Sequence, residues 1–188
     1  MFAKCSPSVP IPYSPFPLAP SMLTRMKTLL RTLLYLALVV WLGAEIFLPI
    51  VAATAFGTLA GDPHRAGAIV GALLRTLHGM GFVCGVVLLA LLALAPAWNI
   101  YKSGTVMPPM ILALIMIALT AWSQFGIIPA MDRDRVAAGG AIDIADTTST
   151  TTADFNKLHN RSVLVEEAII LLGLATVVLV ARAETARA

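Results

Sequence analysis

The sequence predicts an all-α fold, a four-helix transmembrane bundle with up-down topology. Of its 188 residues, 59% are hydrophobic and 12% are charged, whereas a soluble domain is about 25% charged. The mean hydropathy is +0.87. Four apolar stretches each reach the roughly 20 residues that a helix needs to cross the hydrocarbon core. We therefore predict one membrane domain over residues 27–182, with helices at residues 28–55, 65–95, 107–130 and 156–182.

The first residues differ in composition from this domain. Six of the twelve prolines lie within residues 1–21, and proline lacks the backbone N–H that a helix interior needs. We predict a disordered, Pro-rich N-terminal tail over residues 1–26. Met22 and Met26 stay open as alternative translation starts to Met1.

The first predicted helix resembles a secretory signal, because basic residues precede an apolar core. Its apolar run is far longer than the roughly 7–15 residues of a signal core, and it contains Trp41 and Glu45. We therefore predict a retained helix. Pro49 is expected to kink or end its outer part.

Turn residues separate the later helices. Gly61-Asp62-Pro63 precedes the second helix, which ends at Pro96, and Pro108-Pro109 start the third. Residues 131–154 contain a Gly-Gly pair and a threonine-rich run, and they are predicted to be a flexible outer loop. Residues 183–188 are predicted to be a tail.

The basic residues indicate an orientation. Seven of the thirteen are expected on the side of the two termini: Lys4, Arg25, Lys27, Arg31, Lys102, Arg182 and Arg187. The other six are interleaved with aspartates. The positive-inside rule then predicts cytoplasmic N- and C-termini, in a bacterial inner membrane. The same distribution argues against nucleic acid as a partner and leaves the lipid bilayer as the predicted one.

Polar side chains within the apolar stretches fall at one level. Counting about 1.5 Å per residue puts a polar group of every helix within roughly 5–10 Å of the outer boundary. The candidate binding residues are Glu45, Arg75, His78, Gln124, His159, Ser162 and Glu166. Because such groups are costly in lipid, they normally face a partner helix or a wet cavity. We expect Arg75 to form an ion pair with Glu45 or Glu166, and Gln124 to form interhelical hydrogen bonds.

The two membrane histidines make metal or haem binding an alternative. His78 and His159 could ligate haem, copper or another transition metal, but their spacing matches no recognised motif. We predict no cofactor. Nothing indicates a catalytic nucleophile, a phosphate loop or a dinucleotide fingerprint, so enzymatic activity is not expected.

Four blocks of residues resemble the transmembrane protein 205-like family, whose bacterial members form a domain of unknown function. The blocks are Trp41-Leu42-Gly43 with Phe47, Leu77-His78 with Val83-Cys84-Gly85, Ser123-Gln124-Phe125 with Pro129, and Phe155 with Leu158-His159 and Ser162. The resemblance covers about residues 27–182 and implies a four-helix integral membrane protein without established enzymatic activity.

The chain departs from that family at acidic positions. Glu166 stands where the family has Asn, Asn160 stands where it has Gly, and Glu45 replaces an apolar or amide residue. Glu45 and Glu166 are therefore expected to pair with Arg75 or Arg161.

Three functional hypotheses follow. The first is a non-enzymatic protein whose outer polar layer binds or passes a small polar solute or ion. The second is a haem- or copper-handling protein using His78 and His159. The third is a structural or partner-binding subunit in which the polar layer only fixes the register of the helices. The solute and the oligomeric state are left open.

Overall fold

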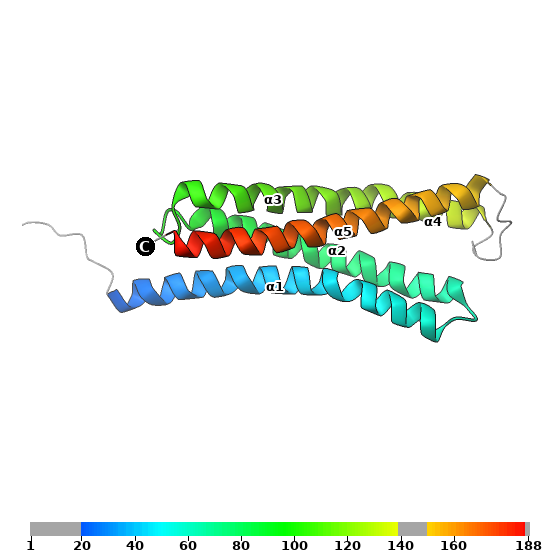
Figure 1. Ribbon diagram of the computed structural model, residues 1–188, viewed down its shortest axis with the longest axis horizontal. Coiled ribbons are helices and arrows are strands. Elements are labelled where there is room, and N and C mark those ends of the chain that lie inside the picture. Colours follow the sequence, from blue (N-terminus) through cyan, green and yellow to red (C-terminus); the bar gives the residue numbers. More distant parts are fainter. Residues whose placement is uncertain (1–19, 139–149, 187–188) are drawn as a thin grey trace, which may run out of the picture.

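Long helices make up the computed structural model, which describes residues 20–138 and 150–186 (Figure 1). The elements are α1 (Pro20–Thr58), α2 (Pro63–Leu94), α3 (Ser103–Trp122), a π-helical turn (Ser123–Ile127), α4 (Ile128–Ala137) and α5 (Thr150–Thr185). Because α3, the π-helical turn and α4 follow one another without a break, the described chain consists of four rods and contains no strand. This confirms the predicted all-α four-helix architecture. Most of the Pro-rich tail and the centre of the outer loop lie outside the described residues.

The four rods run alternately up and down (Figure 1). One end of the bundle, here called the terminal end, holds the start of α1, the α2–α3 connection and the end of α5. The other, the distal end, holds the α1–α2 turn, α4 and the start of α5. Around the bundle, α1 packs on α2, α2 on α3 and α3 on α5, while the seam between α1 and α5 is thinner. All four rods are long and apolar enough to cross a membrane. The chain is therefore a multi-pass integral membrane protein.

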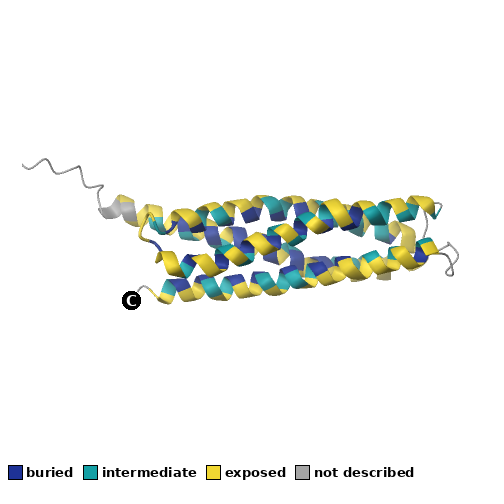
Figure 2. Ribbon diagram, turned by 90° about the horizontal axis from the view of Figure 1, so that it is seen from above, coloured by how far each residue is buried: buried dark blue, intermediate teal, exposed yellow. Residues whose placement is uncertain are grey.

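Burial follows narrow stripes along each rod, and exposed residues cover the outside (Figure 2). Many of the exposed side chains are large and apolar, such as Phe125 at 73% and Leu171 at 67% exposure. An apolar outer surface of this extent suits contact with lipid rather than with water.

The helices extend beyond the predicted bounds at several points. α1 begins at Pro20, within the predicted tail, since proline is tolerated in a first helical turn. α1 also continues past Pro49 to Thr58, and it curves along this outer part (Figure 1). α5 continues to Thr185, within the predicted C-terminal tail.

Both sides of the predicted outer loop are also partly helical. α4 reaches Ala137 and α5 starts at Thr150. These segments pack on each other: Thr152 is 5% exposed, and the Arg135 guanidinium lies 5.6 Å from the centre of the Phe155 ring. This packing stabilises helix where composition alone predicts a loop.

The short connections use residues suited to tight turns. The Asp62 side chain accepts a hydrogen bond from the Arg65 N–H at 2.9 Å and caps α2, and Pro63 occupies the first turn. In the α2–α3 connection, Asn99 adopts φ 50°, a left-handed conformation that asparagine tolerates better than most residues.

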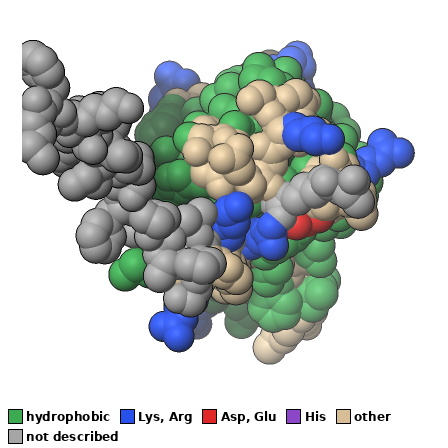
Figure 3. Space-filling view, turned by 90° about the vertical axis from the view of Figure 1, so that its left-hand side faces the viewer, with side chains coloured by type: hydrophobic (Ala, Val, Ile, Leu, Met, Phe, Trp, Pro, Cys, Tyr) green, Lys and Arg blue, Asp and Glu red, His purple; other side chains and the backbone are tan. Residues whose placement is uncertain are grey.

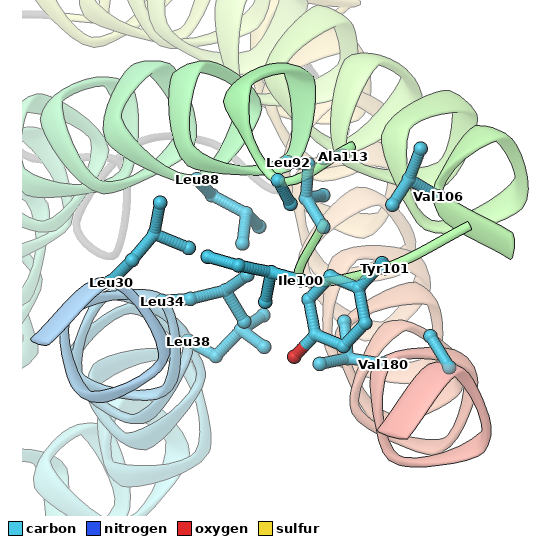
Figure 4. Close-up of a cluster of buried hydrophobic side chains, with 12 residues drawn as sticks. Leu30, Leu34, Leu38, Leu88, Leu92, Ile100, Tyr101, Val106, Ala113 and Val180 are labelled. Carbon is cyan, nitrogen blue, oxygen red and sulfur yellow. The ribbon is translucent and has the colours of Figure 1, made fainter. Parts of the chain in front are cut away.

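A core of apolar side chains closes the terminal end (Figure 4). It includes Leu30, Leu34, Leu38, Leu88, Leu92, Ile100, Val106 and Val180. Tyr101 lies at its edge, 4% exposed, and donates a hydrogen bond to Glu184 Oε1 at 2.5 Å. Arg31 lies 3.5 Å from the same oxygen. Burial, and then the contact with Glu184, raise the pKa of the Tyr101 hydroxyl above its ordinary value.

Two glycines let α2 approach the Trp41 ring of α1 in the middle of the bundle. A Cβ on Gly81 would lie 2.8 Å from Trp41 Nε1. A Cβ on Gly85 would lie 2.7 Å from Ile117 Cγ1 and 2.9 Å from Trp41 Cζ3. Small residues at such positions allow close helix packing in membranes.

We predict that Gly85→Ala lowers the free energy of unfolding by about 1–2 kcal/mol, because the added methyl group overpacks the α1–α2–α3 contact. Gly79→Ala is the matched control, since a Cβ there meets nothing within 4 Å. Unfolding of each variant in mixed detergent micelles measures the difference. Equal stability of the two variants would contradict the packing described for Gly85.

Candidate functional site

His78 is the centre of a polar cluster formed by α2, the π-helical turn and α5. Its ring is fully buried, at 0% exposure. Nδ1 lies 2.9 Å from Gln124 Oε1, and Nε2 lies 3.0 Å from Glu166 Oε1. Both partner atoms are oxygens, so the ring can donate to both only as an imidazolium beside an ionised Glu166. The other arrangement is a neutral ring that accepts a hydrogen bond from a protonated Glu166. In both arrangements one proton lies between His78 Nε2 and Glu166 Oε1.

Ser123 joins the same cluster through the shape of the π-helical turn. Its hydroxyl donates to Glu166 Oε1 at 3.1 Å. Adjacent residues of an α-helix point about 100° apart, yet Ser123 and Gln124 both reach the His78–Glu166 pair. The turn is widened because the Ile128 N–H bonds to the Ser123 carbonyl, five residues back. Pro129 accounts for this, since its ring would clash with the carbonyl four residues before it in a regular α-helix.

Glu45 reaches the cluster from α1 and is 1% exposed. Neither of its carboxyl oxygens has a hydrogen-bonding partner of good geometry. The Glu166 carboxyl, the His78 ring and the Trp41 indole are close enough to act on it electrostatically. The Trp41 Nε1 and Glu166 Oε2 atoms are also buried without a partner. An ionised carboxylate in this position would be costly unless a positive charge compensated it.

Arg75 does not provide that charge, and its predicted pairing with Glu45 or Glu166 is wrong. The guanidinium instead forms an ion pair with Asp132 of α4, whose other oxygen lies 3.8 Å from Arg135. Arg75 lies about one turn nearer the distal end than His78, so its long side chain reaches the partly exposed region around α4. Among the described residues, no lysine or arginine forms an ion pair with either buried glutamate.

His159 and Ser162 lie on α5 toward the distal end, and both line a pocket at the α1–α5 seam. His159 is exposed, and its ring stacks on Phe155 with centroids 6.4 Å apart. It precedes Glu166 by seven residues, about 10 Å along the helix.

The two histidines therefore do not fit a shared haem or copper site. Both ring nitrogens of His78 are occupied by Gln124 and Glu166, and His159 lies about two turns away from that contact. Within the described residues, no three His, Cys, Asp or Glu side chains are arranged to hold a metal ion.

Three features of the site were not predicted from the sequence. Asp132 falls within the predicted outer loop of residues 131–154, whereas in the structure it lies in α4, which continues to Ala137. Trp41 is not among the predicted site residues, although its spacing of four from Glu45 places both on one helix face. The seam pocket has no sequence signal, because it depends on how far α1 lies from α5.

The cluster lies far from the terminal end, where Lys and Arg side chains gather (Figure 3). Glu45 follows Arg25 by twenty residues, and Glu166 precedes Arg182 by sixteen. These separations correspond to about 24–30 Å, close to the thickness of the hydrocarbon core. Along the rods the cluster lies near the middle, since His78 is about halfway along α2 (Pro63–Leu94) and Glu166 is about halfway along α5 (Thr150–Thr185).

The fold and this embedded cluster define a multi-pass membrane protein with ionisable groups held between its helices. The chain belongs to the family described as "Domain of unknown function (DUF4149)", which matches residues 36–137. The matched segment includes Trp41, Glu45, His78 and Gln124, whereas Glu166 lies outside it. No curated protein matches the chain, and no solved structure matches it.

We predict that Gln124→Leu lowers the free energy of unfolding by about 1–3 kcal/mol, because a buried His78 nitrogen loses its partner. Trp122→Leu is the control, since Trp122 is 53% exposed on the outer surface two positions earlier. Unfolding in mixed micelles compares the two. A loss no larger than that of Trp122→Leu would show that the Gln124 contact adds nothing to stability.

Proposed function

We propose that the protein is a non-enzymatic membrane protein that binds or passes a small cation at the cluster of Glu45, His78 and Glu166. The observation that supports this most directly is Glu45, a carboxyl group with 1% exposure whose two oxygens have no hydrogen bond of good geometry, although the Glu166 carboxyl and the Trp41 indole lie close to it. A group that only stabilised the fold would be expected to have its partners satisfied. Glu45 instead offers two oxygens to a positively charged occupant.

The charges of the cluster support the same proposal. It contains two carboxyl groups and one imidazole, and Arg75 is engaged by Asp132. With both carboxyls ionised, even an imidazolium leaves one negative charge uncompensated in a low-dielectric region. One monovalent cation, or one proton as the smallest case, restores neutrality. Gln124 holds the His78 ring in place, and Ser123 holds the Glu166 carboxyl group in place, for binding of that cation.

We predict that sodium, potassium or ammonium ions stabilise the purified protein, and that Glu45→Gln abolishes the effect. A ligand that binds only the folded state adds about 1.4 kcal/mol at ten times its dissociation constant. The thermal unfolding midpoint in detergent is measured against each cation at constant ionic strength. Asp154→Asn, at an exposed carboxyl of α5, is the control and should keep the response.

The proposal fails if no cation distinguishes the wild-type protein from both Glu45→Gln and Glu166→Gln. Because glutamine has nearly the shape of glutamate, the variants test the charge rather than the packing.

A structural role is the second candidate, because His78 is fully buried and has both ring nitrogens hydrogen-bonded across three helices. Such contacts can fix the register of helices in a membrane. Under this alternative, Glu45→Gln would leave every cation response unchanged and raise the stability by removing a buried acid.

We also propose that the protein lies in a bacterial inner membrane with both termini in the cytoplasm, and that its family is related to the transmembrane protein 205-like proteins that its sequence blocks resemble. The basic side chains of the terminal end support the orientation (Figure 3). A cysteine placed at Lys102 should then resist membrane-impermeant thiol reagents in intact cells, in a background without Cys5 and Cys84. A cysteine placed at Gly61 should react, and the opposite pattern would overturn the orientation.

A further inference from the structure

A pocket of about 420 Å³ lies at the seam between α1 and α5, with part of α2 as its floor. Its α1 wall is apolar and includes Pro49, Ala53 and Phe56, and Val70 and Leu74 of α2 continue this surface. The pocket is not a closed void, since Ala53 and Phe56 are exposed. It lies between α1 and α5, which pack less closely on each other than the other neighbouring rods do.

The α5 wall of the pocket is polar. Glu166 and Glu167 both line it, together with His159 and Ser162. Glu166 is also the residue through which the pocket meets the His78 cluster, because its Oε1 atom contacts His78 and Ser123. The same carboxyl group therefore belongs both to the buried cluster and to an opening on the lipid-facing side.

We infer that the seam pocket binds an organic ammonium compound with an apolar body, the ammonium group pairing with Glu166 and the body lying against α1 and α2. This inference rests on the proposed function and names the class of cation. The volume lies in the range of pockets that hold small organic ligands. An ammonium supplies a positive charge, and its N–H groups can donate hydrogen bonds to the Glu166 and Glu167 carboxyl groups of the α5 wall.

The chemistry of the pocket disfavours other occupants. Two adjacent carboxylates repel an anionic group, including the phosphate of a phospholipid. A bare metal ion would leave the apolar α1 wall unused, whereas an apolar body packs against it.

The inference is tested with the full chain in phosphatidylcholine nanodiscs and three ligands that share one body: phenylbutylamine, phenylbutanol and phenylbutyrate. We expect saturable binding of about one radiolabelled phenylbutylamine per chain. The alcohol should compete about tenfold less well and the carboxylate still less, because only the amine can form a charge-assisted pair with Glu166. Equal competition by the amine and the alcohol would overturn the inference.

Two variants test the two walls separately. Glu166→Gln should weaken binding of the amine about tenfold or more. Ala53→Trp should weaken it by filling the pocket while leaving the carboxyl intact. Thr54→Trp, at the adjacent exposed residue outside this pocket, should bind the amine like the wild type. If Glu166→Gln fails to fold, Ala53→Trp still decides: unchanged binding in that variant overturns the inference.

The outcomes separate this inference from the proposed function. If sodium or potassium stabilises the protein through Glu45 but the amine does not bind saturably, the proposed cation site stands. The inference of an organic ligand is then wrong. If phosphatidylethanolamine in the nanodiscs displaces the amine fully, the pocket belongs to a lipid headgroup and the small-ligand inference is wrong.

Discussion

The cost of placing ionisable side chains in hydrocarbon is the constraint on which the arrangement of this bundle depends. Each such group must find a partner on another helix, because lipid offers none. His78 satisfies this requirement through Gln124 and Glu166, and these contacts fix the relative rotation of three rods. Glycines then allow α1 to approach closely enough for Trp41 to cover the cluster. The apolar cores on either side pack around positions that the polar contacts have already set.

Much of the architecture could be predicted because a bilayer imposes length and composition on whatever crosses it. Four apolar stretches could only become four spanning helices, and short connections made neighbours antiparallel. Counting residues also predicts that the polar side chains lie at one height along the bundle, because the rise per residue is the same in every helix. These side chains are Glu45, His78, Gln124 and Glu166. His78, Gln124 and Glu166 do meet, because polar residues at one depth have few partners other than each other.

The remaining features depend on side-chain reach and on distances between helices, which periodicity does not encode. The Arg75 side chain is long enough to extend either toward the cluster or toward the distal end. It extends toward the distal end because α4 continues past the predicted span. Asp132 becomes its partner only because that helix continues. The seam pocket likewise depends on the bend of α1 near Pro49 and on the thin α1–α5 contact. Neither can be read from the residues of one helix.

The widened turn at Ser123–Ile127 links two regions that are otherwise separate. One additional residue in a helical turn shifts the angular phase of everything that follows by about 100°. The phase of α4 places Asp132 toward Arg75, while Ser123 at the start of the turn reaches Glu166 and Gln124 reaches His78. Pro129 follows this turn directly, so one stretch of ten residues, from Ser123 to Asp132, carries both the contacts to the buried His78–Glu166 pair and the ion pair with Arg75.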